Sequence, residues 1–161
     1  MNALGANTAA DNSGFGHRSL AENTTGARNV AVGANALDAN TTAHYNTAVG
    51  HAALNVNTTG QYNCALGVNA LKSNTTANAN VAIGYNALED NTGNIHAAVG
   101  FEALKENTTG NNSTAVGGYA LKVNTEGNNN NAMGYYALGA TTTGSNNSGF
   151  GYQVLLSLIH I

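Results

Sequence analysis

The sequence predicts an all-β protein, a parallel β-solenoid of about nine coils. Three observations support this class. A leucine and a glycine each recur every 16 or 17 residues, an Asn-Thr-Thr-Gly segment recurs with them, and charged residues make up only 8% of the 161 residues. An average soluble domain has about 25% charged residues, so Asn, Thr and Gly must supply much of this surface. The alternative of a disordered Asn-rich tract would not need to keep the leucine and glycine registers.

The repeat unit explains the choice of a solenoid. One complete unit runs from Asn46 to Tyr62 and follows the pattern N-x-A-[VIL]-G-x-x-A-L-x-x-N-T-T-G-x-x. This period is shorter than that of helical repeats, which run from about 33 to 47 residues, and it is not a multiple of seven. A coil of 16 or 17 residues, with two short strands and two turns, fits it.

Each element of the coil follows from its residues. The first strand is expected over Asn-x-Ala-Val-Gly (46–50 in this unit), and the second from Ala53-Leu54 onward. The Asn-Thr-Thr-Gly segment (57–60) is expected to form a wide turn, because Asn and Gly accept left-handed backbone angles. Neighbouring strand residues point to opposite faces, so both faces of both strands would carry apolar side chains. Long apolar stripes on an outer face indicate an interface, which predicts an oligomer.

Stacked coils would place equivalent residues about 4.8 Å apart, giving a rod roughly 45 Å long. Alanines and asparagines would then form ladders along the axis, with the amides hydrogen-bonded to one another. The predicted structural ladder is Asn23, Asn40, Asn57, Asn74, Asn91, Asn107 and Asn124.

Two segments carry a family resemblance. Asn80-Val81-Ala82-Ile83-Gly84 and Asn29-Val30-Ala31-Val32-Gly33 resemble the head repeats of trimeric autotransporter adhesins, the YadA-like left-handed β-roll. The longer Asn-Thr-Thr-Gly coils also look like repeats of phage and viral tail-fibre proteins. The resemblance implies a left-handed β-roll and a homotrimer. It also implies an extracellular location, either at the bacterial cell surface or outer membrane, or on a virion tail. The expected function is a structural and adhesive module that contacts a host-surface protein or glycan receptor.

The domain organisation is expected to be a single repeat array over residues 1–155. The array begins and stops in mid-coil, which suggests a fragment of a longer solenoid. The tail at 156–161, Leu-Ser-Leu-Ile-His-Ile, has none of the repeat's chemistry. It resembles the translation of a transposon end used to tag sequencing libraries, so a sequencing artefact and a capping strand are both open.

The residues argue against a catalytic, cofactor or metal site. Cys64 stands alone, the histidines are scattered, and acidic residues form no repeated ligand pattern, so we expect no catalytic, cofactor or metal site. The net charge of −3 argues against nucleic acid, and no apolar run approaches the roughly 20 residues of a membrane helix. We therefore predict that the chain is not an enzyme.

Exposed aromatic residues are the candidates for surface contacts, since such side chains are favoured in binding hot spots. They could instead pack on each other or across a seam between chains. These candidates are Tyr85, Phe101, Tyr119, Tyr135, Tyr136 and Tyr152. A second hypothesis is an ice-binding solenoid, because threonine pairs such as Thr58-Thr59 recur in most coils. Adjacent threonines on a strand would face opposite sides, which disfavours it.

Overall fold

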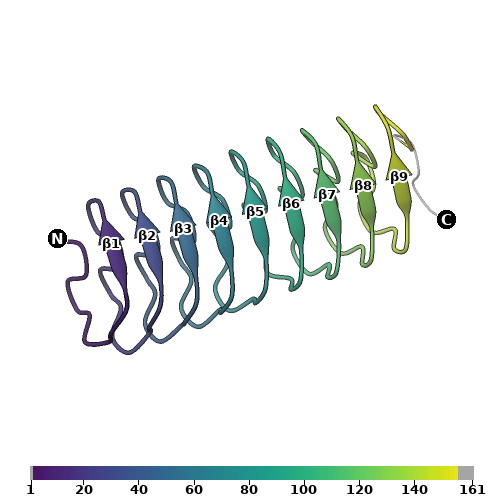
Figure 1. Cartoon of the computed structure of the whole chain (residues 1–161). Helices are drawn as coiled ribbons and strands as arrows, with labels where there is room; N and C mark the ends of the chain where they lie inside the picture. The colour runs from purple at the N-terminus through teal and green to yellow at the C-terminus, as the bar shows by residue number, and fades with distance from the viewer. Residues whose placement is uncertain (1, 156–161) are drawn as a thin grey trace.

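A computed structural model describes residues 2–155 and confirms the all-β solenoid. The described residues form one sheet of nine parallel strands that follow the chain order (Figure 1). The strands are β1 (Ser13–Phe15), β2 (Val30–Val32), β3 (Thr47–Val49), β4 (Cys64–Leu66), β5 (Val81–Ile83), β6 (Ala97–Val99), β7 (Thr114–Val116), β8 (Asn131–Met133) and β9 (Ser148–Phe150). We number each coil by its strand. Met1 and the non-repeat tail at 156–161 lie outside the described residues.

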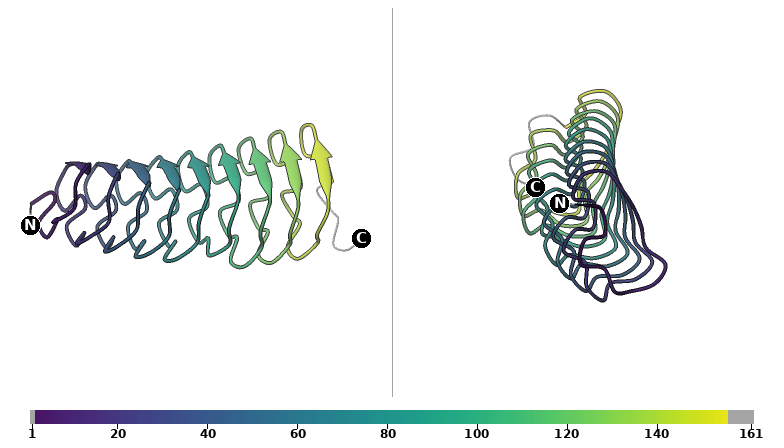
Figure 2. Two further views of the ribbon diagram at one scale, coloured as in Figure 1. Left: turned by 60° about the horizontal axis from the view of Figure 1, so that its bottom comes forward. Right: turned by 90° about the vertical axis from the view of Figure 1, so that its left-hand side faces the viewer.

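The strands pair in strict register, because each coil repeats the one before it. Ala31 of β2 pairs with Ala48 of β3, and Ala48 pairs with Ala65 of β4. Equivalent residues therefore stack along one axis. The right-hand view in Figure 2 shows the coils as flattened rings stacked one behind another, each shifted a little from the one before.

The expected second strand is wrong: each coil contains one strand. In coil 3 the chain leaves β3 through Gly50 with φ 135°, then passes Ala52 with φ 55° and Leu54 with φ 50°. This alternation of left- and right-handed residues makes a series of turns. A left-handed non-glycine residue costs of order 1–3 kcal/mol, which the burial of a leucine side chain offsets. Because Leu54 is not on a strand, it and Ala53 do not face opposite sides, and both are fully buried.

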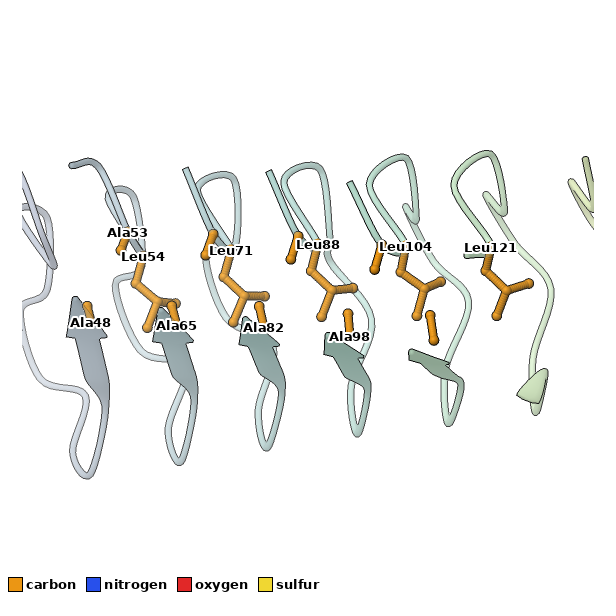
Figure 3. Packing of buried hydrophobic residues seen from close by; sticks show 14 of the residues in the cluster. Ala48, Ala53, Leu54, Ala65, Leu71, Ala82, Leu88, Ala98, Leu104 and Leu121 are labelled. Carbon is orange, nitrogen blue, oxygen red and sulfur yellow. The ribbon is translucent and has the colours of Figure 1, made fainter. Parts of the chain in front are cut away.

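The core is a narrow column of small residues facing large ones. The middle residue of each strand points inward and is alanine from β2 to β8. The leucines of the opposite wall extend toward these alanines, as Leu54, Leu71 and Leu88 do in Figure 3. No helix within residues 2–155 is long and apolar enough to cross a membrane.

Candidate functional site

The predicted asparagine ladder is present in two sections. All seven asparagines are fully buried. Within the first section the amide of Asn57 donates to Asn40 Oδ1 at 3.2 Å, and that of Asn74 donates to Asn57 Oδ1 at 2.9 Å. The second section links Asn107 to Asn91 at 2.7 Å and Asn124 to Asn107 at 3.1 Å.

The expected continuity of this ladder is wrong at one step, between Asn74 and Asn91. The turn after Asn91 is one residue shorter than in neighbouring coils. As a result, Asn91 folds back on its own turn: its Nδ2 donates to the Gly93 carbonyl at 2.7 Å, and its Oδ1 accepts from the Gly93 N–H at 3.1 Å. The Oδ1 of Asn74 is left buried without a hydrogen-bond partner.

A second buried ladder lies just before the strands and was not predicted. The side chain at this position accepts the backbone N–H of its counterpart in the next coil, as Asn29 does from Asn46 at 2.9 Å and Asn46 from Asn63 at 2.9 Å. Its Nδ2 also donates to a carbonyl 14 residues later, for example from Asn46 to Gly60 at 2.9 Å. The signal was the Asn that opens the repeat pattern. His96 and Ser113 replace Asn in coils 6 and 7.

The threonine pairs occupy a bend at the edge of each coil. The hydroxyl of the first threonine donates along the axis to the threonine carbonyl of the next coil, as Thr24 does to Thr41 at 2.9 Å and Thr58 to Thr75 at 3.1 Å. Much of the donor capacity of this column is therefore used within the solenoid.

The outer side of the sheet is an uncharged surface that extends from β1 to β9. We call it the sheet face: the first and last residues of β1 to β9, which point outward. It contains no Asp, Glu, Lys or Arg. The last position is apolar in every strand, and its exposed members include Phe15 at 67%, Leu66 at 46% and Met133 at 51%.

The charged residues all lie in other parts of the coil, and most of them form ion pairs there. Lys122 contacts Glu102 at 2.8 Å, and this hydrogen bond lowers the pKa of Glu102. Lys105 lies 3.7 Å from Glu89 and 3.8 Å from Glu102, and Arg18 contacts Asp38 at 2.8 Å. Charge is thus kept away from the sheet face.

The six candidate aromatic residues form one continuous cluster over coils 5 to 9, next to the sheet face. Tyr85 stacks on Phe101 with ring centroids 5.2 Å apart, and Tyr135 stacks on Tyr152 at 5.6 Å. Between these pairs the column has Gly118 in place of a ring. Tyr119, one residue further on, bridges the interval through edge contacts with Phe101 at 5.2 Å and Tyr135 at 5.7 Å.

The rings of the cluster pack on each other, which is one of the two expected arrangements, and a role in surface contacts stays a prediction. Tyr136 joins the cluster at 5.1 Å from Tyr119. Tyr85, Phe101, Tyr135 and Tyr152 nevertheless remain exposed. Lys122 lies over the ring of Tyr119, with its Nζ 5.2 Å from the centroid.

A second, smaller aromatic group was missed. Tyr45 and Tyr62 stack at 5.2 Å on the opposite edge of the sheet face, with the guanidinium of Arg28 over Tyr45 at 5.4 Å. The signal was their spacing of one period. Both residues immediately precede the asparagine that opens a coil.

No three His, Cys, Asp or Glu side chains gather within residues 2–155 as a metal site would require, and no pocket is found there. Cys64 is half-buried on the sheet face and carries a free thiol.

Comparisons with known proteins were made for the whole chain. No family model, no curated protein and no solved structure matches it.

Proposed function

We propose that this chain is a structural and adhesive module that assembles as a homotrimer through the sheet face. It would be displayed on a bacterial cell or a virion tail, where it contacts a host-surface protein or glycan. The observation that carries the proposal is the absence of charged residues from a face that has an apolar side chain, exposed or half-buried, at the end of every strand. Contiguous exposed apolar surface of this kind marks interaction sites.

The length of the face favours a second copy of the chain as its partner. Eight steps of about 4.8 Å separate β1 from β9, so the partner must offer an uncharged surface roughly 38 Å long. A second solenoid has such a surface. Fully burying one Val, Leu or Phe side chain contributes about 1.5–3 kcal/mol, and association costs about 4–15 kcal/mol. The nine apolar side chains at the strand ends are already partly buried, so each contributes a fraction of this value, and their sum is of the same order as the cost of association. Three copies are the number that the sequence resemblance implies.

The aromatic cluster is the proposed receptor contact. It lies at the border of the sheet face, beside the ion pairs of Glu102 and Lys122. Tyrosines at such a border combine apolar area with hydroxyls that can donate and accept hydrogen bonds. Replacing Tyr135 by alanine should reduce binding to host cells or to an immobilised glycan panel. The matched control is Tyr62→Ala, which removes a similarly exposed ring from the opposite edge.

Ice binding is the second candidate, because threonine pairs recur in most coils. Its support is weaker, since the first hydroxyl of each pair is used within the solenoid and the segment is bent. Thermal hysteresis of the purified chain would favour it over adhesion.

The mass of the full chain by light scattering tests the assembly. We expect three copies for the unaltered chain and a smaller species for Leu66→Lys, which puts a charge on the sheet face. Val56→Lys is the matched control, because Val56 is also exposed, at 37%, but lies outside the sheet face. A monomeric unaltered chain, or equal effects of the two lysines, would refute the role of this face.

The single cysteine tests how the copies are arranged. In a parallel, in-register trimer, Cys64 lies at the same height in every copy, so a short bismaleimide should link them. Cys64→Thr should abolish the link, and adding Val81→Cys in the next coil should restore it. An antiparallel arrangement would allow linking at one height only.

A further inference from the structure

His96 occupies an unusual place in the buried ladder that precedes the strands. Asn29, Asn46, Asn63 and Asn80 hold this position in coils 2 to 5, whereas coil 6 has an imidazole that is only 2% exposed. The turn just before it is the one shortened by a residue. His96 is therefore a titratable group inside a ladder otherwise built from groups that do not titrate.

The hydrogen bonds of His96 define its protonation state. Its Nε2 lies 2.8 Å from the Gly110 carbonyl oxygen, which can only accept, so Nε2 carries the hydrogen. Its Nδ1 accepts the backbone N–H of Ser113 at 3.2 Å, so Nδ1 must be unprotonated. The amide nitrogen of Asn107 lies 3.2 Å from Nε2 and is another donor. The imidazole thus meets one acceptor and two donors.

We propose that His96 is an acid-sensitive joint between coils 6 and 7. Protonation at Nδ1 replaces an accepted hydrogen bond by two N–H groups that face each other. The one hydrogen-bond partner of Nδ1 among the described residues is the Ser113 N–H, which is a donor and cannot take the new hydrogen. An asparagine at this position would keep its acceptor and donor at every physiological pH.

No ionised group offsets the added charge. The charged residues within ten positions of His96 in the sequence are Glu89, Asp90, Glu102, Lys105 and Glu106. Lys105 is paired with Glu89 at the surface, and no acidic or basic side chain in residues 2–155 has a hydrogen bond or ion pair with His96. Burial lowers the pKa of His96, an effect that the bond to the Gly110 carbonyl partly opposes.

The sign of the pH dependence follows from this lowered pKa. The unfolded chain binds a proton near the ordinary value of 6.5, and the folded chain binds it only at lower pH. Stability is therefore complete above about pH 6.5 and is lost as the pH falls below it. Each coil of a solenoid contacts only its neighbours, so the loss is concentrated where coils 6 and 7 meet.

Melting temperatures of the full chain at about pH 7.5 and about pH 5 test the proposal. His96→Asn should reduce the acid-induced fall in melting temperature by at least about 3 °C relative to the unaltered chain. His51→Asn is the matched control, because His51 is exposed, and it should leave the fall unchanged. An equal fall in the unaltered chain and in His96→Asn would overturn the proposal.

Hydrogen exchange of the unaltered chain gives a test that needs no variant. After correction for intrinsic rates, acid should remove protection at the Ser113 amide and its neighbours in coil 7 before it affects the joint between β2 and β3. Uniform loss of protection along the solenoid, or loss starting elsewhere, would overturn the assignment to His96.

Discussion

Replacing single asparagines of the buried ladder tests how far the side-chain hydrogen bonds stabilise the solenoid. Asn57 and Asn74 are suited to this test, because the Oδ1 of Asn57 accepts a hydrogen bond and the Oδ1 of Asn74 does not. Asn57 makes three side-chain hydrogen bonds: it donates to Asn40 Oδ1 and to the Gly60 carbonyl, and it accepts from Asn74. Asn74 only donates, to Asn57 Oδ1 and to the Ala77 carbonyl, and its own Oδ1 is unpaired. Alanine at either position leaves one amide oxygen of the preceding coil without a donor.

The magnitudes follow from these bonds. A buried hydrogen bond contributes about 1 kcal/mol net, so Asn57→Ala should lower the free energy of unfolding by about 3 kcal/mol. Asn74→Ala loses two bonds but also removes an unpaired buried oxygen, whose desolvation costs about 1 kcal/mol or more. Its expected loss is about 1 kcal/mol. The difference between the variants should thus be about 2 kcal/mol.

Urea unfolding followed by circular dichroism, at one protein concentration, measures both values. Asn55→Ala is the control, since this half-buried amide has a single bond, to the Asn35 carbonyl at 3.1 Å, and should lose less than about 1 kcal/mol. If Asn74→Ala is as destabilising as Asn57→Ala, the ladder bonds do not carry the stability assigned to them.

Three other substitutions test the packing and the surface charges. Gly67→Ala should prevent folding, because its Cβ would lie 2.3 Å from a carbonyl oxygen of the next coil. Gly118→Ala should fold, because the shortest contact of its Cβ is with a ring carbon of Tyr135 at 3.4 Å. Equal circular dichroism spectra of the two variants would contradict this. Leu71→Ala should lower the unfolding free energy by about 3 kcal/mol in urea, and a loss under about 1 kcal/mol would mean a loosely packed core. Glu102 has a pKa lowered by Lys122, so its pairing stabilises the fold above about pH 4.5 and is lost as the pH falls through the lowered pKa. Glu102→Gln should therefore flatten the acid side of the stability profile by a small, salt-sensitive amount, and an unchanged profile would exclude this pair as a contributor.

Much of the fold could be predicted because stacking forces equivalent residues together. The period identified the coil, Ala48 and its counterparts were placed on a strand, and Asn40 and Asn57 were placed in a ladder. The second strand could not be excluded in this way. Leucines such as Leu54 adopt left-handed angles only because the coil's packing demands them, and no local preference of leucine signals this conformation.

The candidate site was predicted in part. The aromatic cluster from Tyr85 to Tyr152 could be recognised as one column of the repeat. The contacts of Tyr119 with Phe101 and Tyr135 were not predicted, because they depend on Gly118 having no side chain in that column. The break after Asn74 could not be foreseen, because a one-residue deletion shows where the register shifts and not which bond is lost. His96 was visible only as one of five scattered histidines. Its importance comes from the partners that stacking gives it.

The coil-by-coil arrangement also determines how the chain can fold. Most side-chain hydrogen bonds between coils join residues 16 to 20 positions apart, and every strand pairs only with the strand before or after it. Such a chain has no long loop to close, so a first pair of coils can serve as a template on which the next coil is laid down. Growth can then keep pace with a chain that is delivered progressively from one end, and the rod can gain or lose whole coils without any change in the structure of those that remain.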